Sequence, residues 1–353
     1  MTIHPTPKRT RLTWLLMGFV LAGMIGCGPQ TFVVNLGGAA QGLEASAIQR
    51  DGKLGSRHVA MLDISGTLTN SNAGGLLAAG DNAVAKLAEG LRAAAGDAKV
   101  AAVILRVNTP GGTVTASDMM YQEIRRFRQQ TGKPVIVLMM DLATSGGYYL
   151  ACAADRIVAY PTTVTGSIGV IFPTFTVKPA LDRLGVRTDA IVSGPNKAAA
   201  SPFETLEDDQ RTILQDMVDD FYRRFVGVVR EGRPTIRPET FGMITDGRVF
   251  TGRRALELGL VDEVGDVHTA FAAAKSAAGL ESADLIVYHR PMQYVTTPYS
   301  RGGGTPPSAS GTARADAATA TQINLLQLNL DTASLLGPGR AAGLYYLWQP
   351  ELP

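Results

Sequence analysis

The chain has 353 residues, of which 45% are hydrophobic and 18% are charged, so it can bury a sizeable core and is neither collagen-like nor wholly disordered. Its 33 basic and 31 acidic residues give a net charge of +2 without a block of like charges, so a nucleic-acid partner is unsupported. With only two cysteines, Cys27 and Cys152, neither a disulfide framework nor a cysteine zinc site is expected.

Residues 1–27 have the pattern of an export signal. Three basic residues precede position 12, and an uncharged apolar run follows over 12–26. Met24-Ile25-Gly26-Cys27 resembles a bacterial lipobox, which makes Cys27 a candidate for lipidation. The alternative is a short uncleaved anchor in which Cys27 is an ordinary small residue. Because the positive charges come first, we expect the body at the cell membrane on its extracytoplasmic side.

After a weakly patterned leader over 28–57, the predicted elements alternate between strand and helix. Strands are predicted over 58–69, 100–107, 134–140, 156–160 and 283–289, and helices over 83–95, 116–130, 146–153, 206–230 and 269–278. This alternation predicts an α/β fold with parallel βαβ units in one domain, 58–290. In the long helix Thr205 is the expected N-cap, and an apolar stripe joins Ile213, Met217, Phe221, Phe225 and Val228.

The C-terminal part changes composition. Residues 291–322 are rich in Gly, Pro, Ser and Ala, which predicts a disordered linker because such a segment buries too little apolar surface to fold alone. Residues 323–353 form an apolar tail with an aromatic cluster at 345–348. We expect this tail to dock on the body or on a neighbouring subunit. Cys152, Met139 and Met140 are expected in the core, not in a redox or metal site.

Three segments of small residues fall where βα loops are expected, at 108–112, 144–149 and 165–169. Such loops meet at the carboxyl ends of parallel strands, and their glycines let backbone N–H groups face developing negative charge. Ser145 follows a strand and precedes a helix, so its Oγ would lie at the electropositive helix end. Taken alone, a serine at that position is more often an N-cap than a nucleophile.

A base for Ser145 can be sought by elimination. None of the four histidines falls in these loops, which disfavours a Ser-His-Asp triad, and arginine does not release its proton. Lysine remains, and Lys197 has no acidic residue within six positions on either side. Burial there would lower the pKa of its amine into the range of a general base. An exposed lysine on a turn is the alternative.

Several motifs in the same order resemble the signal peptide peptidase A family, the Ser-Lys proteases of peptidase family S49. They are Asn108-Thr109-Pro110-Gly111-Gly112, Ser145-Gly146-Gly147-Tyr148-Tyr149, Ala154-Asp155-Arg156-Ile157, Thr165-Gly166-Ser167-Ile168-Gly169-Val170, the segment 246–255 and Gly259-Leu260-Val261-Asp262. The resemblance covers about residues 58–290. It implies a fold like that of the Clp protease and crotonase superfamily.

By motif position, the resemblance implies that Ser145 is the nucleophile and Lys197 the general base. Ser167 would orient the lysine amine, and the backbone N–H groups of Gly112 and Gly146 would form the oxyanion hole. The sequence departs from the family pattern at Ala198, where an acid commonly follows the lysine, and over 70–80, which matches nothing in the pattern.

The expected function is that of a membrane-associated serine endopeptidase that cleaves hydrophobic peptides, such as released signal peptides, through an acyl-enzyme. No metal or organic cofactor is expected. The resemblance also implies a homo-oligomer, an octamer being one form, in which neighbouring subunits share active sites. Two alternatives stay open: a crotonase-type acyl-CoA enzyme, and a catalytically inactive, membrane-tethered scaffold of the same fold.

Overall fold

A computed structural model describes residues 42–51, 57–71, 82–291, 293, 295–300 and 345–347, the last three by their backbone alone. All of them belong to one unit of the chain, which begins at Gly42. The expected export signal with Cys27 lies outside the described residues, as do most of the predicted linker and tail. No helix among the described residues combines the length and apolar character needed to cross a bilayer.

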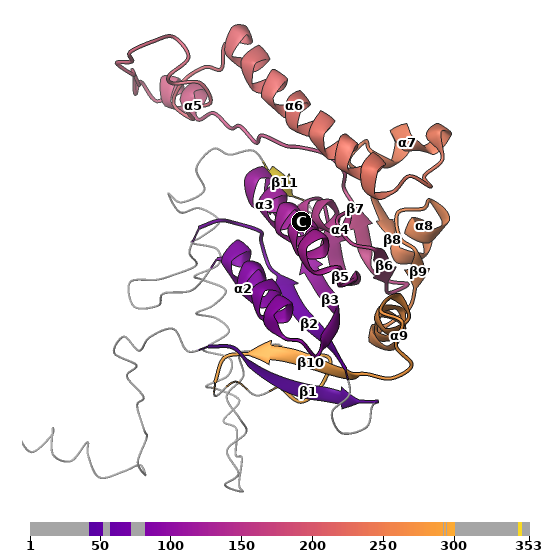
Figure 1. Cartoon of the computed structure of the whole chain (residues 1–353). Helices are drawn as coiled ribbons and strands as arrows, with labels where there is room; N and C mark the ends of the chain where they lie inside the picture. The colour runs from indigo at the N-terminus through magenta and orange to yellow at the C-terminus, as the bar shows by residue number, and fades with distance from the viewer. Residues whose placement is uncertain are drawn as a thin grey trace, which may run out of the picture. The chain divides into compact units, whose positions relative to one another are not determined.

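Nine strands of the described residues form one sheet, in which β1, β10, β2, β3, β5, β6 and β9 lie side by side in that order (Figure 1). Strands β10 to β9 run parallel, whereas β1 is antiparallel to its neighbour β10. Strand β7 continues beside β5, and β8 pairs antiparallel with β7. The predicted α/β class with parallel βαβ units is therefore confirmed. The strands are β1 (Glu44–Arg50), β2 (His58–Ser65), β3 (Val100–Thr109), β5 (Val135–Thr144), β6 (Arg156–Ala159), β7 (Val164–Gly166), β8 (Val249–Thr251), β9 (Glu263–Val264) and β10 (Asp284–His289).

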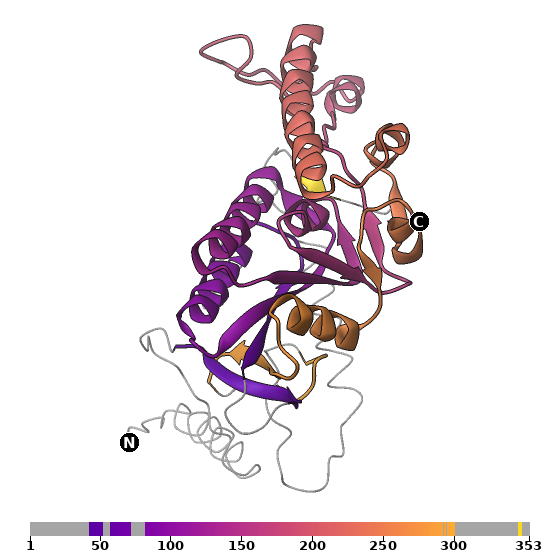
Figure 2. The same ribbon diagram turned by 45° about the vertical axis from the view of Figure 1, so that its right-hand side comes forward.

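Both faces of the sheet are covered by helices (Figures 1 and 2). Val103 and Leu105 of β3 belong to the larger core, with side chains of α2 (Ala83–Gly96), α3 (Val114–Thr131) and α4 (Gly146–Ala151). Ala102 and Ile104 belong to a second core with side chains of α9 (Val267–Ala277). Because neither face meets water, the parallel strands are continuous apolar runs, and for this reason the sequence reveals them so clearly.

Two segments predicted to lie outside the body are part of it. The predicted leader contains β1, which pairs with β10, and the Oγ of Ser46 lies 2.8 Å from Nε2 of His289. The start of the predicted linker also packs on the sheet, because the buried guanidinium of Arg106 donates to the carbonyl oxygens of Pro298 and Ser300. Both associations join positions far apart in the chain, so local composition does not reveal them.

The long helix α6 spans Asp208–Gly232, two residues later than predicted. Its N-cap is Glu207, not Thr205, and the backbone N–H of Glu207 donates to the Oε1 of Gln210 at 3.4 Å. Only part of the predicted apolar stripe is buried: Phe225 and Val228 are in the core, whereas Ile213 is 44% and Met217 42% exposed. The other helices among the described residues are α5 (Lys178–Arg183), α7 (Pro238–Ile244) and α8 (Gly252–Glu257).

The predicted core positions are confirmed. Met139 and Cys152 are buried, and Met140 is partly buried against the second core. Burial raises the pKa of the Cys152 thiol to about 12, so this side chain is a small apolar group at neutral pH.

Candidate active site

Ser145 has an unusual backbone conformation at the junction of β5 and α4. Its φ is 53° and its ψ is −113°, a region that a residue with a side chain rarely adopts. The backbone N–H of Ser145 donates to the carbonyl of Gly166 at 2.8 Å, and its carbonyl accepts from the N–H of Tyr149 at 2.8 Å. Such a conformation costs about 1–3 kcal/mol and persists only where surrounding contacts impose it. These contacts with strand β7 and helix α4 therefore hold the Ser145 backbone and fix where its side chain points.

The hydroxyl of Ser145 is buried and has no hydrogen-bond partner among the described residues, and the whole residue is only 1% exposed. It makes no capping bond to α4, so the N-cap interpretation is wrong for this side chain. A buried hydroxyl without a partner costs about 1–3 kcal/mol, and such groups concentrate where function requires them. The arrangement suits a nucleophile whose base is supplied from elsewhere.

Gly112 and Gly146 lie next to each other beside Ser145. A Cβ built on Gly146 would lie 3.3 Å from the backbone nitrogen of Gly112 and 2.3 Å from the Oγ of Ser117. A Cβ on Gly112 would lie 2.0 Å from the carbonyl oxygen of Leu68. Neither position has room for a side chain, so the two backbones approach as closely as an oxyanion hole requires.

The direction of the Gly112 N–H follows from strand β4 (Gly111–Thr113). The carbonyl of Gly111 accepts from the N–H of Leu68 at 2.8 Å, and the N–H of Thr113 donates to the carbonyl of Leu68 at 2.9 Å. Successive residues of a strand direct their polar backbone groups to opposite edges. The N–H and C=O of Gly112 therefore face away from Leu68. Thr109 fixes this turn, since its Oγ1 accepts from the N–H of Gly111 at 3.1 Å.

Ser167 follows β7 directly and also has a positive φ, 51°. It is 8% exposed, and its N–H donates to the carbonyl of Arg248 at 2.8 Å. Its neighbour Gly166 accepts from the N–H of Ser145, so the backbones at 145 and 167 are one hydrogen bond apart. The structure thus brings together Ser145, Ser167, Gly112 and Gly146 from three separate loops, as the clustering of small residues predicts.

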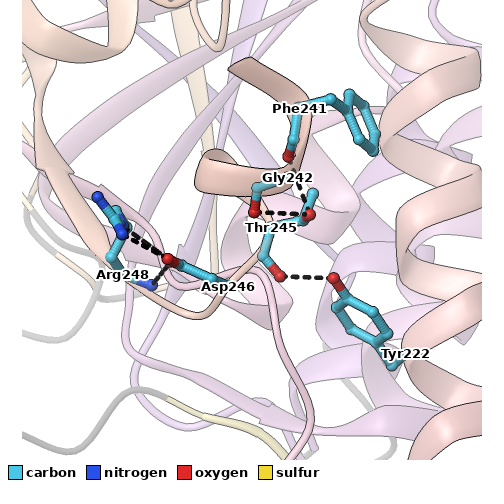
Figure 3. Close-up of polar contacts among 6 residues, drawn as sticks. All are labelled: Tyr222, Phe241, Gly242, Thr245, Asp246 and Arg248. Carbon is cyan, nitrogen blue, oxygen red and sulfur yellow. Dashed lines mark hydrogen bonds and ion pairs between the residues drawn. The ribbon is translucent and has the colours of Figure 1, made fainter. Parts of the chain in front are cut away.

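The loop that supports Ser167 is anchored to α6 through residues that the sequence analysis did not single out (Figure 3). The hydroxyl of Tyr222 donates to the carbonyl of Thr245 at 2.7 Å, and Thr245 Oγ1 donates to the carbonyl of Phe241 at 2.9 Å. The side chain of Arg248 pairs with Asp246, and its hydrogen bonds hold the pKa of that carboxyl below its usual value. The segment 246–255 carries a family motif, but only the structure shows this role.

A second set of contacts joins α4, the helix that follows Ser145, to two other helices. The hydroxyl of Tyr149 in α4 donates to Oδ1 of Asp118 in α3 at 2.7 Å, and Arg224 of α6 donates to the same oxygen at 2.6 Å. The Tyr149 ring lies between those of Tyr121 and Phe225, with centroids 5.3 and 5.0 Å away. The hydrogen bond to Asp118 raises the pKa of Arg224 above its ordinary value. Aromatic composition alone could not distinguish this contact from ordinary core packing.

Lys197 does not lie in a dry pocket of its own chain. It belongs to the 171–207 segment between β7 and α6, and it is exposed. Its backbone N–H donates to the carbonyl of Gly194 at 3.1 Å, and Gln210 of α6 donates to the carbonyl of Pro195 at 2.7 Å. The expectation of a buried lysine is therefore wrong for the single chain. An acid-free neighbourhood in sequence describes local composition, whereas burial depends on what packs over the segment.

Lys133 is the described lysine whose pKa is lowered by burial, but it does not face Ser145. Its Nζ donates to the carbonyl oxygens of Ala94 at 2.7 Å and Asp97 at 3.0 Å, at the C-terminal end of α2. It precedes β5, whereas Ser145 follows it, so a whole strand separates them. Among the described residues no group of three or more His, Cys, Asp or Glu side chains could hold a metal ion.

We compared the chain with known protein families. The family model described as peptidase family S49 matches residues 127–281, which contain both Ser145 and Lys197. This region of the chain is similar to peptidase family S49. The S49 match begins after β4, the strand that carries Gly112, and ends before β10.

Curated relatives that match this chain include proteases. Protease 4 of Salmonella typhi is 39% identical over 192 residues, which cover 54% of this chain and 31% of that protein. A putative protease of Synechocystis is 37% identical over 183 residues, covering 52% of this chain and 65% of its own. The chain thus spans less than two thirds of each relative. A solved structure of a membrane-bound stomatin-specific protease is 18% identical with a TM-score of 0.39, covering 61% of this chain and 84% of that one.

Proposed function

We propose that this chain is a serine endopeptidase of peptidase family S49 that acts through a Ser145-Lys197 dyad. The observation that carries the proposal is the Ser145 hydroxyl, which is buried without a partner at a strained position. Beside it lie Gly112 and Gly146, where a Cβ does not fit. This juxtaposition supports acyl transfer, which needs a nucleophile close to its oxyanion donors.

The proposed reaction uses these groups in the following order. A neutral Lys197 amine takes the proton of Ser145, whose Oγ forms a bond to the peptide carbonyl carbon. The N–H groups of Gly112 and Gly146 stabilise the oxyanion, each by about 3 kcal/mol. The lysine ammonium then protonates the leaving amine as the C–N bond breaks. Water, deprotonated by the same amine, attacks the acyl-enzyme and releases Ser145 with its proton restored.

The general base must be a lysine amine that is shielded from water. A second copy of the chain can provide this shielding. In the 171–207 segment, Phe175 is 72% and Leu184 76% exposed, which is unusual for large apolar side chains on a finished surface. Packing of this segment against another subunit would remove water from Lys197 and lower its pKa. We therefore propose a homo-oligomer, an octamer being the form that the family resemblance suggests, with Ser145 and Lys197 brought together across subunits.

Hydrophobic peptides, such as released signal peptides, are the proposed substrates. A groove of about 470 Å³ lies between 170–174 and α6, close in sequence to Ser167. Its lining includes Val170, Ile171, Phe172, Leu206, Leu214 and Val218. The export pattern of residues 1–27, with lipidation at Cys27 or an anchor, supports a location at the extracytoplasmic face of the membrane. One relative, from Enterococcus faecium, is named a putative signal peptide peptidase.

Covalent labelling tests the proposal. A fluorophosphonate probe should label Ser145, identified by mass spectrometry of the intact chain and its peptides. Ser145→Ala should abolish labelling and reduce peptide hydrolysis by at least about 10⁴-fold. A wild type that cleaves acyl-CoA thioesters but no peptide would support the crotonase alternative. A wild type that is neither labelled nor active would support the scaffold.

A further inference from the structure

A second buried hydroxyl stands directly before Ser145 in the chain. Thr144 is the last residue of β5 and is fully buried. Its Oγ1 has no hydrogen-bond partner among the described residues, which is also true of the Ser145 hydroxyl. A buried polar group without a partner destabilises a fold, so two of them in succession call for a functional explanation.

Other buried threonines near the ends of these strands do have partners. The Oγ1 of Thr165 donates to the carbonyl of Ala143 at 2.7 Å, and the Oγ1 of Thr163 donates to the carbonyl of Met139 at 3.1 Å. Both residues are as completely buried as Thr144. The backbone in this part of the sheet can therefore satisfy a threonine hydroxyl, and Thr144 is an exception to that pattern.

The sheet register places Thr144 beside the residues of the candidate site. Thr144 is the register partner of Gly166 in β7, and the N–H of Ser145 donates to the carbonyl of Gly166. Ser167 follows Gly166 directly. The pair Thr144-Ser145 thus lies alongside the pair Gly166-Ser167, and three hydroxyl-bearing residues meet at the ends of two neighbouring strands.

A lysine that activates Ser145 needs more than one hydrogen-bond acceptor. A neutral amine has one lone pair and two N–H groups, and in the proposed reaction the lone pair accepts the proton of Ser145. In a site without water each of the two N–H groups needs an acceptor, because an unpaired buried donor costs free energy. The role proposed for Ser167 provides one acceptor, and a second is still required.

We infer that Thr144 is a positioning residue whose Oγ1 accepts a hydrogen bond from the lysine amine that activates Ser145. Together with Ser167 it turns the lone pair of the amine toward the Ser145 hydroxyl. When the amine has taken the proton of Ser145, the same two oxygens accept from the ammonium, and the third N–H faces the leaving amine. The inference rests on the proposed function and adds to it a residue that the family resemblance does not assign.

Two variants of Thr144 test the inference. Thr144→Val removes the hydroxyl with little change of shape, and Thr144→Ser keeps it. Since a hydrogen bond to a charged group is lost, Thr144→Val should lower kcat for peptide hydrolysis by about 10- to 100-fold at unchanged KM. Thr144→Ser should restore kcat to within a few-fold of the wild type.

The pH profile separates this role from a structural one. An oxygen that accepts from the ammonium favours the protonated base, so its loss in Thr144→Val should move the acidic limb of kcat/KM by about one unit to lower pH. The charged groups of the loop beside Ser167, Asp246 and Arg248, pair with each other and are kept in every variant. Thr165→Val is the matched control: it should unfold at a lower denaturant concentration, because it loses the bond to Ala143, but its acidic limb should not move.

Two results would overturn the inference and leave the dyad intact. The first is a wild-type kcat in Thr144→Val. The second is a lower kcat with an unmoved acidic limb, which would mean that the hydroxyl supports the fold or holds a water molecule and not the base. If the wild type neither hydrolyses peptides nor reacts with the fluorophosphonate probe, the proposed function fails and the role of Thr144 fails with it.

Discussion

The two halves of the proposed dyad lie in regions of opposite character. Ser145 sits at the end of a strand buried on both faces, and its backbone is held by Gly166 and Tyr149. Lys197 lies in the 171–207 segment, where residues such as Ile191 are fully exposed. A parallel sheet can fix a nucleophile by itself, because its strand ends are determined by the whole core. The position of the base instead depends on what packs over a segment that its own chain leaves bare.

Loss of Lys197 should give the largest effect on this comparison. Lys197→Ala is expected to lower kcat by about 10²- to 10⁴-fold in a peptide hydrolysis assay, because the proton of Ser145 then has no acceptor. Lys178→Ala is the matched control, since Lys178 lies in the same segment but pairs with Asp182. The control should retain activity close to that of the wild type.

Mixed oligomers test whether Ser145 and Lys197 come from different subunits. Co-assembled Ser145→Ala and Lys197→Ala chains should recover part of the activity if the dyad forms between subunits, because one interface then contains both intact groups. If each dyad forms within one chain, the mixture stays inactive. That outcome would refute shared sites while leaving the dyad intact.

Gly112→Ala should have the next effect. A Cβ 2.0 Å from the Leu68 carbonyl forces β4 to shift, which displaces an oxyanion donor and should lower kcat by about 10²- to 10³-fold. Gly227→Ala is a suitable control, because a Cβ there meets nothing within 4 Å, and helix propensity favours alanine by up to about 1 kcal/mol. Thermal unfolding of both variants, measured with activity, would separate a local shift from loss of fold. Full activity in Gly112→Ala would remove Gly112 from the oxyanion hole.

Tyr149→Phe should have the smallest effect. It deletes the hydrogen bond to Asp118 but keeps the ring between Tyr121 and Phe225, so stability should fall by about 1 kcal/mol. Because Arg224 still pairs with Asp118, kcat should change only a few-fold. Denaturant unfolding measures the first change and peptide hydrolysis the second. A loss of activity as large as that of Lys197→Ala would give Tyr149 a direct part in the chemistry.

The same contrast explains what the sequence could reveal. Strands such as β3 and β5 are apolar on both faces, so the sequence shows them as continuous apolar runs. Few residue types fit the tight turn after β5, so Ser145 and the glycines of the site can be recognised from the local sequence. Strand β1 could not, since its partner β10 lies more than 230 residues later. The exposure of Lys197 is equally hidden, because the uncharged residues around it are compatible with contact to a partner or to water. The first residue of α6 is also hard to predict, because several polar residues in a row could precede the helix. The hydrogen bond between Glu207 and Gln210 shows that Glu207 is the N-cap.

The backbone torsion angles of Ser145 lower the stability of the fold, whereas the proposed chemistry needs a serine at this position. Glycine would adopt φ 53° and ψ −113° with little strain, so Ser145→Gly should make the fold more stable by up to about 1–3 kcal/mol. A residue that weakens the native state persists there only if the hydroxyl is needed. Directed evolution for heat resistance alone, with no demand for turnover, should therefore replace this serine early.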